Sequence, residues 1–491
     1  MQYRIYPPIG IARIGNSETE FFIAAEVPES PGTELQANGT ETPLTEYKTG
    51  NSGNPATSFQ VKRQAARFRL YEFDDAASAG QRAALPAGAT VEWSVQLVNK
   101  KDAVQRPTSP PASAPNAITV QTGRENRIID STVRNISGSQ PGPVTLSGTY
   151  LGHAVPLGEL RLDRDTNLLV LGGAGVSRTF ENASIGADFY NNPGWHDDLS
   201  DGPVTATIRF ADGTVVNAEP AWVIVAPPDF APAVQGVVTL YDTVLQAALS
   251  ANLTTIPAQP SFTDHILPLI KRARGLRWVH DDVTWPAISS NLTQLSDTSN
   301  TPQVTTRRKN AVTGVLRVET AFTHPDYTFR LRAWQKDYLE KYRLGNFIAD
   351  FGTATPPDPA AATTLTRAAL DGTVGEGFFP GIEAGIILTK TSIYRQPFEF
   401  RLDHTKVGAG DLTALMALPW QADFMKCASG WWPTQRPNRV PSAATPRPDW
   451  DRGITNHQDL VNRVMRLGVI TRRPDVGGQE VQEESLRDPA V

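Results

Sequence analysis

Residues 221–250 read AWVIVAPPDFAPAVQGVVTLYDTVLQAALS, and the spacing of their apolar side chains changes halfway along. The run at 221–228 is rich in β-branched residues and ends in two prolines, a pattern typical of a strand. From residue 236 the apolar side chains recur at helical spacing, at Val237, Leu240, Tyr241, Val244, Leu245 and Ala248. The stretch predicts a change near residue 235 from a β-rich region to one with more helix.

Both sides of this boundary continue the same patterns. Before it, β-branched runs bounded by turn residues predict strands at 91–99, 167–173 and 204–210. After it, helical spacing recurs at 327–344, and residues 356–372 begin as a Pro/Ala loop and end as a short helix. The predicted fold class is α+β, with a β-rich N-terminal half.

We expect three regions along the chain. A mostly β domain spans 1–235, and a mixed, more helical region spans 236–474 and carries the active site. The remaining residues, 475–491, are polar and poor in aromatic side chains, so we expect them to fray as a tail.

Composition narrows the class of protein. The chain has 491 residues, 46 basic and 51 acidic, and the resulting net charge of -5 argues against a nucleic-acid partner. It has no run of eighteen apolar residues and no standard signal peptide, so we expect no membrane span and a cytoplasmic protein, or one exported by another route. The seven histidines lack ligand spacing, so we expect no metal site.

The one cysteine of the chain lies at 427, within PWQADFMKCASGWWP (419–433). A single thiol excludes an internal disulfide. Residues 408–418 predict a helix capped by Asp411 and ended by Pro419. The following QADFMKC fits one or two further turns, which place Asp423 and Cys427 at positions i and i+4 on one face.

The residues after the cysteine predict a sharp reversal. Gly430 permits a tight turn and Pro433 forbids a continuing helix, so Trp431 and Trp432 turn back toward the thiol. Spacing alone leaves two interpretations open. The group is either a buried thiol among packed aromatic side chains, or a chemical site.

The segment PWQADF, followed by a cysteine and then WWPTQRP, resembles the C-terminal signature of the quinoprotein amino-acid oxidases. This is the LodA-like family of lysine ε-oxidase and glycine oxidase. Further blocks resemble the family in the same order, at 5–17, 157–175, 194–204, 221–232, 237–242, 378–385 and 408–424. The resemblance covers nearly the whole chain, and its most specific part is the segment around Cys427.

The resemblance implies a cysteine tryptophylquinone cofactor made from the protein's own side chains. Cys427 supplies the sulfur and either Trp432 or Trp431 supplies the indole. Asp423 matches the family aspartate that acts in cofactor formation and in proton transfer, a role that suits a carboxylate whose pKa burial raises. Such a quinone oxidises a primary amine or amino acid through a Schiff base, and O2 then yields H2O2 while ammonia is released.

The same resemblance implies partners: a flavoprotein that matures the quinone, and a second copy of the chain in a homo-oligomer. His404 is a further candidate that could face the quinone. An amino-acid substrate needs a cation for its carboxylate, and the candidates are Arg436, Arg439, Arg401 and Lys406. Trp420 and Trp450 are expected to pack or to form part of a pocket wall, and Tyr241 is expected to pack its helix.

Two other classes of function stay open from the sequence. The chain is either an unmodified scaffold in which Cys427 is a free thiol, or a quinone enzyme of another kind. The second class includes an amine dehydrogenase that passes electrons to a protein, and a biosynthetic tailoring enzyme.

Overall fold

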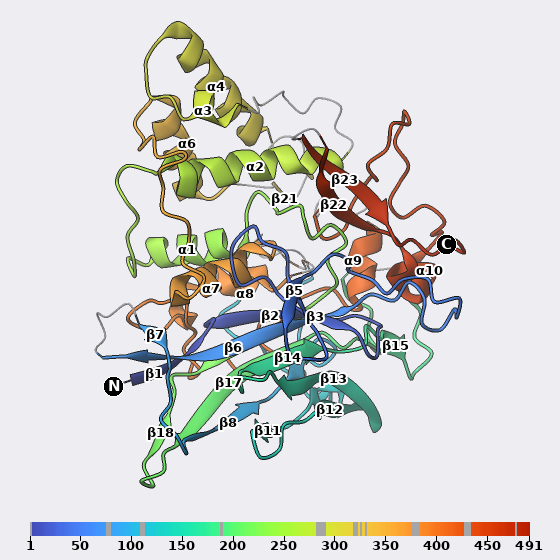
Figure 1. The fold of residues 1–491 in the computed structure, drawn as a ribbon. Coiled ribbons are helices and arrows are strands. Elements are labelled where there is room, and N and C mark those ends of the chain that lie inside the picture. The colour runs from blue at the N-terminus through green and yellow to red at the C-terminus, as the bar shows by residue number, and fades with distance from the viewer. Residues whose placement is uncertain are drawn as a thin grey trace.

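The computed structural model describes residues 2–74, 80–108, 113–186, 190–280, 291–317, 323–324, 327–328, 331–375, 379, 381, 383–426, 434–476 and 479–491. A large mixed sheet lies below most of the helices in Figure 1, and α9, α10 and the C-terminal hairpin lie above its right-hand end. The strand-rich part comes from the first half of the chain and most helices come from the second half. The predicted α+β fold class is confirmed.

One sheet contains most of the strands of the first half. In chain order they are β1 (Gln2–Tyr6), β2 (Ile9–Arg13), β3 (Phe21–Ile23), β4 (Thr33–Leu35), β5 (Glu41–Pro43), β6 (Arg63–Phe73), β7 (Gln81–Arg82), β8 (Thr90–Val95), β9 (Val98–Asn99), β10 (Ile129–Asp130), β11 (Arg134–Ser137), β12 (Val144–Tyr150), β13 (His153–Leu162), β14 (Leu168–Gly172), β17 (Ser200–Arg209), β18 (Val215–Asn217) and β19 (Ala221–Ala226). The strands predicted at 91–99, 167–173, 204–210 and 221–228 are all present, the first as β8 and β9.

The long strand β6 organises this sheet. It pairs antiparallel with β1 and with β14, while β2 pairs parallel with β19. A Cβ atom at Gly10 of β2 would come within 2.4 Å of the Phe68 ring of β6, so a residue with a side chain does not fit there. The missing side chain therefore lets β2 and β6 pack closely.

The helices of the second half lie mostly above the sheet in Figure 1, and α7 contacts β1 and β2. They are α1 (Leu240–Ser250), α2 (Leu267–Gly275), α3 (Leu292–Leu295), α4 (Pro302–Leu316), α6 (Ala333–Arg343), α7 (Ala362–Asp371), α8 (Gly385–Leu388), α9 (Trp420–Lys426) and α10 (His457–Arg463). The helices predicted after residue 236 and at the end of 356–372 are α1 and α7. Short two-stranded pairs are β15 (Arg178–Thr179) with β16 (Trp195–His196), β20 (Thr323–His324) with β21 (Tyr327–Thr328), and β22 (Val469–Val476) with β23 (Gln479–Ser485).

Two sequence-based helix predictions are corrected. Residues 408–418 form successive turns, because the Asp201 carboxylate accepts the backbone N–H groups of Gly410 and Thr413, at 3.2 and 2.8 Å. Asp411 is therefore no helix cap and pairs with Lys100. The helix predicted over 327–344 begins only at Ala333, and Tyr327–Thr328 is strand β21.

The expectation of a frayed C-terminal tail is wrong. Residues Gln479–Ser485 form β23, which pairs with β22, and the Ile470 N–H of β22 donates to the Phe230 carbonyl at 2.7 Å. Gln482 is 2% exposed despite its polarity. Backbone pairing holds this segment, and a count of apolar side chains does not detect that. The domain boundaries near 235 and 474 stay predictions.

Three helices meet around one buried cation. Arg272 of α2 pairs with Asp242 of α1 at 2.9 Å and with Asp371 of α7 at 2.8 Å, and all three side chains are at most 4% exposed. Asp242 also completes a capping box with Thr239 at the start of α1. The network fixes these helices against one another.

We predict that Arg272→Met lowers the free energy of unfolding by about 3–5 kcal/mol, because it leaves the buried Asp242 without its paired cation, while Asp371 keeps only Arg367, at 3.1 Å. Chemical denaturation measures this change. Lys341→Met is the matched control, since Lys341 pairs at 2.7 Å with Asp337, which is 53% exposed; its loss should stay below about 1 kcal/mol. Equal losses in the two variants would contradict the role of the network.

Candidate active site

The helix predicted around Asp423 is present as α9 (Trp420–Lys426). It ends one residue before Cys427. Asp423 is 2% exposed. Cys427, Trp431 and Trp432 lie outside the described residues, so their predicted placement relative to Asp423 stays a prediction.

A carboxylate from the N-terminal half holds the start of α9. Asp197 accepts the Trp420 N–H at 3.0 Å and pairs with Lys101 at 2.5 Å, and neither side chain of the ion pair is exposed. Asn99 donates to the same carboxylate at 3.1 Å. Burial lowers the pKa of Lys101 to about 8, while the charge of Asp197 opposes this shift. The Asp197 carboxylate therefore joins the end of β9 to the first turn of α9.

The loop after β14 forms a second attachment for α9. The Asp198 carboxylate accepts the N–H groups of Gly175 and Val176, at 2.7 and 3.2 Å. A Cβ atom at Gly173 would come within 2.4 Å of that carboxylate, so only glycine fits there. The glycines of this loop serve its turn, and Ser177 then donates to the Gln421 side chain at 2.9 Å.

The block around 196–201 is buried. His196, Asp197, Asp198 and Asp201 are all at most 2% exposed. The carboxylates of Asp197, Asp198 and Asp201 accept N–H groups from other segments of the chain, although the Oδ1 of Asp198 has no hydrogen-bond partner among the described residues. Within the described ranges, no group of three His, Cys, Asp or Glu side chains has the arrangement of a metal site.

Aromatic rings surround the buried face of α9. Trp420 and Phe424 meet edge to face at 4.8 Å, and Phe230 contacts both Phe424, at 6.3 Å, and Trp450, at 4.9 Å. Trp420 and Trp450 are fully buried, so their predicted packing role is confirmed. The Nε1 of Trp420 and the Nε2 of Gln421 are buried without an acceptor among the described residues. Such donors are expected where a bound group or an ordered water completes a site.

Arg436 holds the chain that follows 427–433 against α9. Its Nε donates to the Phe424 carbonyl at 2.8 Å, its Nη1 to the Pro437 carbonyl at 2.7 Å, and its Nη2 to Asp451 at 2.6 Å. The guanidinium also lies 5.3 Å from the centre of the Trp450 ring. Arg436 is 1% exposed and binds protein groups in its described contacts, and its suggested role as the substrate cation stays a prediction.

The other cation candidates lie apart from α9 in their described contacts. Arg401 donates to the carbonyls of Pro220 and of Ile5, the latter at 3.0 Å. Arg439 pairs with Asp449, and Lys406 is exposed. None of these described contacts involves Asp423.

His404 packs at the beginning of β19. Its ring lies edge-on to Trp222 at 4.9 Å, and burial and the charge of Arg401 lower its pKa to about 4, so the imidazole is neutral at pH 7. None of its described contacts reaches α9, and its catalytic role stays a prediction. Tyr241 stacks on Phe400 at 4.7 Å, which confirms the prediction that it packs.

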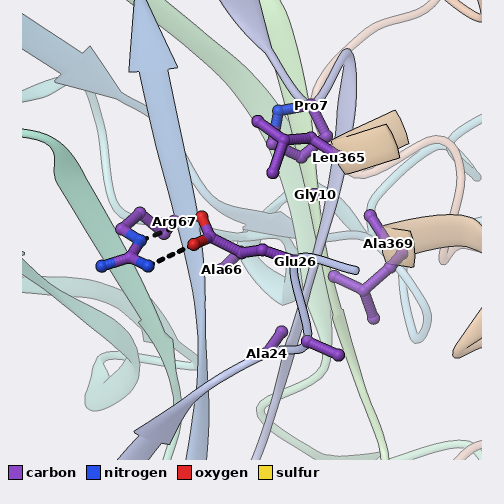
Figure 2. Close-up of a pocket in the computed structure, with 10 residues that line it drawn as sticks. Pro7, Gly10, Ala24, Glu26, Ala66, Arg67, Leu365 and Ala369 are labelled. Atoms are coloured by element: carbon purple, nitrogen blue, oxygen red, sulfur yellow. Dashed lines mark hydrogen bonds and ion pairs between the residues drawn. The ribbon is translucent and has the colours of Figure 1, made fainter. Parts of the chain in front are cut away.

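A small pocket lies between β2, β6 and α7, away from the contacts that hold α9 (Figure 2). Its wall is mostly apolar, with Pro7, Gly10, Leu365 and Ala369 among its lining residues. The Glu26 carboxylate in this wall points to Arg67. Burial opposes ionisation of Glu26, but hydrogen bonds from Arg67 and Arg69 lower its pKa to about 2. The negative charge of Glu26 is therefore paired with these two arginines of the protein.

The sequence pattern did not identify Asp197, Lys101 or Arg436 as residues that position α9. Their partners are far away along the chain, so no local spacing connects them. The one local sign in the sequence was the group of carboxylates at 196–201, but such a composition is also typical of turns. In the described part of the chain, no helix has the length and apolar character needed to cross a bilayer.

We predict that Asp198→Asn changes the pH dependence of stability. Burial, with the charge of Asp197, raises the pKa of Asp198 from 3.8 to about 7. The folded state thus keeps a proton that the unfolded chain releases, so wild-type stability falls as pH rises from about 4 to 7 and this contribution is lost above that. In the wild type we expect the free energy of unfolding to fall by on the order of 2–4 kcal/mol between pH 4 and 8, as measured by denaturant titrations. The variant should lack this fall.

The control for that measurement is Asp165→Asn, whose carboxylate is 68% exposed. It should follow the wild-type profile. An Asp198→Asn profile parallel to wild type would show that the buried carboxyl carries no such proton.

Two family models match the chain. The model described as L-lysine epsilon oxidase N-terminal matches residues 6–225, and the one described as L-lysine epsilon oxidase C-terminal domain matches residues 317–444. The chain is also 25% identical to L-lysine 6-oxidase from Marinomonas mediterranea, over 87% of this chain and 71% of that protein.

Solved structures show the same fold. The crystal structure of the L-Lys ε-oxidase from Marinomonas mediterranea has a TM-score of 0.76 at 20% identity, and the match covers 99% of this chain and 95% of that one. The crystal structure of the Schiff base intermediate of that enzyme with L-Lys has a TM-score of 0.75, with the same identity and coverage.

Proposed function

Because the chain belongs to the L-lysine ε-oxidase family, we propose that it oxidises the primary amine of an amino acid or related compound with a quinone made from its own side chains. The family membership supports amine oxidation. The observation that carries the finer proposal is the position of Asp423, which is buried on a helix that ends one residue before Cys427.

The described residues around α9 fit such a cofactor. Cys427 and either Trp432 or Trp431 would hold it, and the buried donors of Trp420 and Gln421 are available to a polar group beside them. A cysteine tryptophylquinone supplies an electrophilic carbonyl that takes up an amine and two electrons, which no unmodified side chain provides.

The protein's own groups supply position and proton transfer. Asp423 acts as the base in this proposal, because its carboxylate is buried, 2% exposed, on the helix that leads to Cys427. Asp197 at one end of α9 and Arg436 at the other fix the helix, and with it the direction of the Asp423 side chain. The ring cluster of Trp420, Phe424 and Phe230 keeps water away from that side of the helix.

The net reaction balances with O2 as oxidant. One amine, one O2 and one water give one carbonyl product, one ammonia and one H2O2. The amine-bearing carbon loses two electrons, and O2 gains them. L-Lysine is the first substrate to test because related enzymes are named for it. A flavoprotein monooxygenase is the proposed maturation partner.

We predict that the chain coexpressed with such a flavoprotein gains two oxygen atoms, loses four hydrogens and absorbs visible light. Intact mass and absorbance measure this change, and O2 uptake with H2O2 release on adding L-lysine or other primary amines measures the activity. Asp423→Ala should leave an incompletely processed chain with at least about 100-fold less activity, the range for loss of an acid–base group. Asp212→Ala, in the exposed turn before β18, is the control.

Each alternative gives a distinct result. A full quinone spectrum in Asp423→Ala contradicts the role of Asp423. A quinone that reduces an artificial acceptor but not O2 indicates an amine dehydrogenase. An unmodified mass with a freely titrating thiol in wild type indicates a scaffold protein.

A further inference from the structure

Another buried cluster of charges lies where β2 ends. Arg13, the last residue of β2, pairs with Glu383 at 2.9 Å, and both residues are 3% exposed. The guanidinium also donates to the backbone carbonyls of Pro227 and Gly372, at 2.8 and 3.1 Å. The cation is therefore engaged by one carboxylate oxygen and two carbonyls.

The second oxygen of Glu383 is different. Its Oε1 accepts from Arg13, whereas its Oε2 is buried without a hydrogen-bond donor among the described residues. Burial raises the pKa of Glu383, and the charge of Arg13 opposes that shift. A buried carboxylate oxygen without a donor is uncommon in folded proteins, so this atom points to a bound group that completes it.

Asp229 brings another carboxylate to the cluster. It follows the prolines after β19 and is half-buried, and the Ala231 N–H donates to its Oδ1 at 2.9 Å. Burial raises the pKa of Asp229 to about 7, while the charge of Arg13 lowers it and that of Glu383 raises it. In the described part of the chain, Arg13 forms an ion pair with Glu383 and not with Asp229. Two carboxylates thus share one cation, which leaves a negative charge uncompensated when both are ionised.

Tyr47 adds a hydroxyl group beside Asp229. Burial and the charge of Asp229 raise the pKa of Tyr47, so its hydroxyl lies in the field of that carboxylate and keeps its proton at neutral pH. The residue is half-buried, and its ring meets Phe22 edge to face at 5.5 Å. Among the described residues, its hydroxyl has no hydrogen-bond partner.

We propose that Asp229, Glu383 and Tyr47 bind the ammonium group of a small primary amine. Such a group has three N–H donors and one positive charge. The cluster provides acceptors at Oδ2 of Asp229, Oε2 of Glu383 and the hydroxyl oxygen of Tyr47, and bonds from a cation to carboxylates are among the strongest in proteins. The bound charge compensates the carboxylate that Arg13 does not pair with.

This ammonium site lies near the helix that carries Asp423. Asp229 directly precedes Phe230, whose ring contacts Phe424 of α9 at 6.3 Å. Amines are also the substrates of the oxidation proposed above, so the site is a second amine-binding position in the same part of the core. It does not depend on that oxidation, because all of its residues are unmodified side chains.

The test uses the chain expressed without the flavoprotein, and methylammonium chloride is the probe. Isothermal titration calorimetry at pH 8 should show saturable binding to one site per chain. Tetramethylammonium chloride has the same charge without N–H donors and should bind at least about 10-fold more weakly, because it cannot form the charged hydrogen bonds. Sodium chloride at the same concentration controls for ionic strength. Equal binding of the two organic cations would overturn the proposal.

Asp229→Asn removes one charge and keeps the oxygen that accepts the Ala231 N–H. It should weaken methylammonium binding at least about 10-fold. Asp358→Asn is the matched control, since Asp358 accepts the Ala360 N–H at 2.8 Å in the same way but is exposed. It should bind as wild type does. Equal affinities of Asp229→Asn and wild type, or equal losses in both variants, would overturn the proposal.

A proton competes with the ammonium group for the cluster. Because the pKa of Asp229 is about 7, wild-type binding of methylammonium should be about 10-fold weaker at pH 6 than at pH 8. Equal affinity at the two pH values would overturn the role of Asp229. If methylammonium does not bind at either pH, a proton alone compensates the cluster, and the proposal is wrong.

Folding and the proposed oxidation are checked separately. Thermal melts before each titration identify a variant that does not fold. If Asp229→Asn does not fold, Tyr47→Phe gives the decision, because it removes the hydroxyl acceptor and should weaken methylammonium binding at least about 3-fold; wild-type affinity would overturn the proposal. A coexpressed chain without a quinone would contradict the proposed oxidation and leave these binding results unchanged.

Discussion

The position of α9 depends on a buried ion pair between Lys101 and Asp197, neither of which is exposed to solvent. Two charges removed from water are stable only when their remaining hydrogen-bonding positions are filled. Asn99 and the Trp420 N–H fill those of Asp197. The pair therefore fixes how β9, the connection between β16 and β17, and α9 lie relative to one another. The position of the sheet thus determines the position of the helix that carries Asp423.

The two ends of α9 are held by groups of opposite charge. A carboxylate meets the N–H groups of the first turn, and a guanidinium meets a carbonyl of the last turn, which is the arrangement that the helix dipole favours. A helix of seven residues is too short to be stable alone. Its stability comes from these anchors and from the rings of Trp420 and Phe424, so Asp423 sits on an element whose position is set by tertiary contacts.

The sequence predicted what depends on local pattern. The strands β14, β17 and β19 and the helices α1 and α7 follow from apolar spacing and turn residues. The same reasoning gave a wrong helix prediction for residues 408–418. There, N–H groups that a helix would use donate to Asp201, more than 200 positions away in the sequence. The C-terminal segment was misjudged because strand pairing, not side-chain burial, orders β23. At the candidate site, spacing found the helix around Asp423, whereas its chemical role came from the family resemblance. Arg436 was identified as a possible substrate ligand, which stays a prediction, whereas its contacts with Phe424 and Asp451 could not be inferred from local spacing.

The described contacts that fix α9 involve Asp197, Gln421, Phe424 and Arg436, and none of them requires a bond between Cys427 and a tryptophan. Unmodified side chains therefore hold α9 in place. The quinone proposed above would form next to a helix whose position is already set, because these contacts do not depend on it.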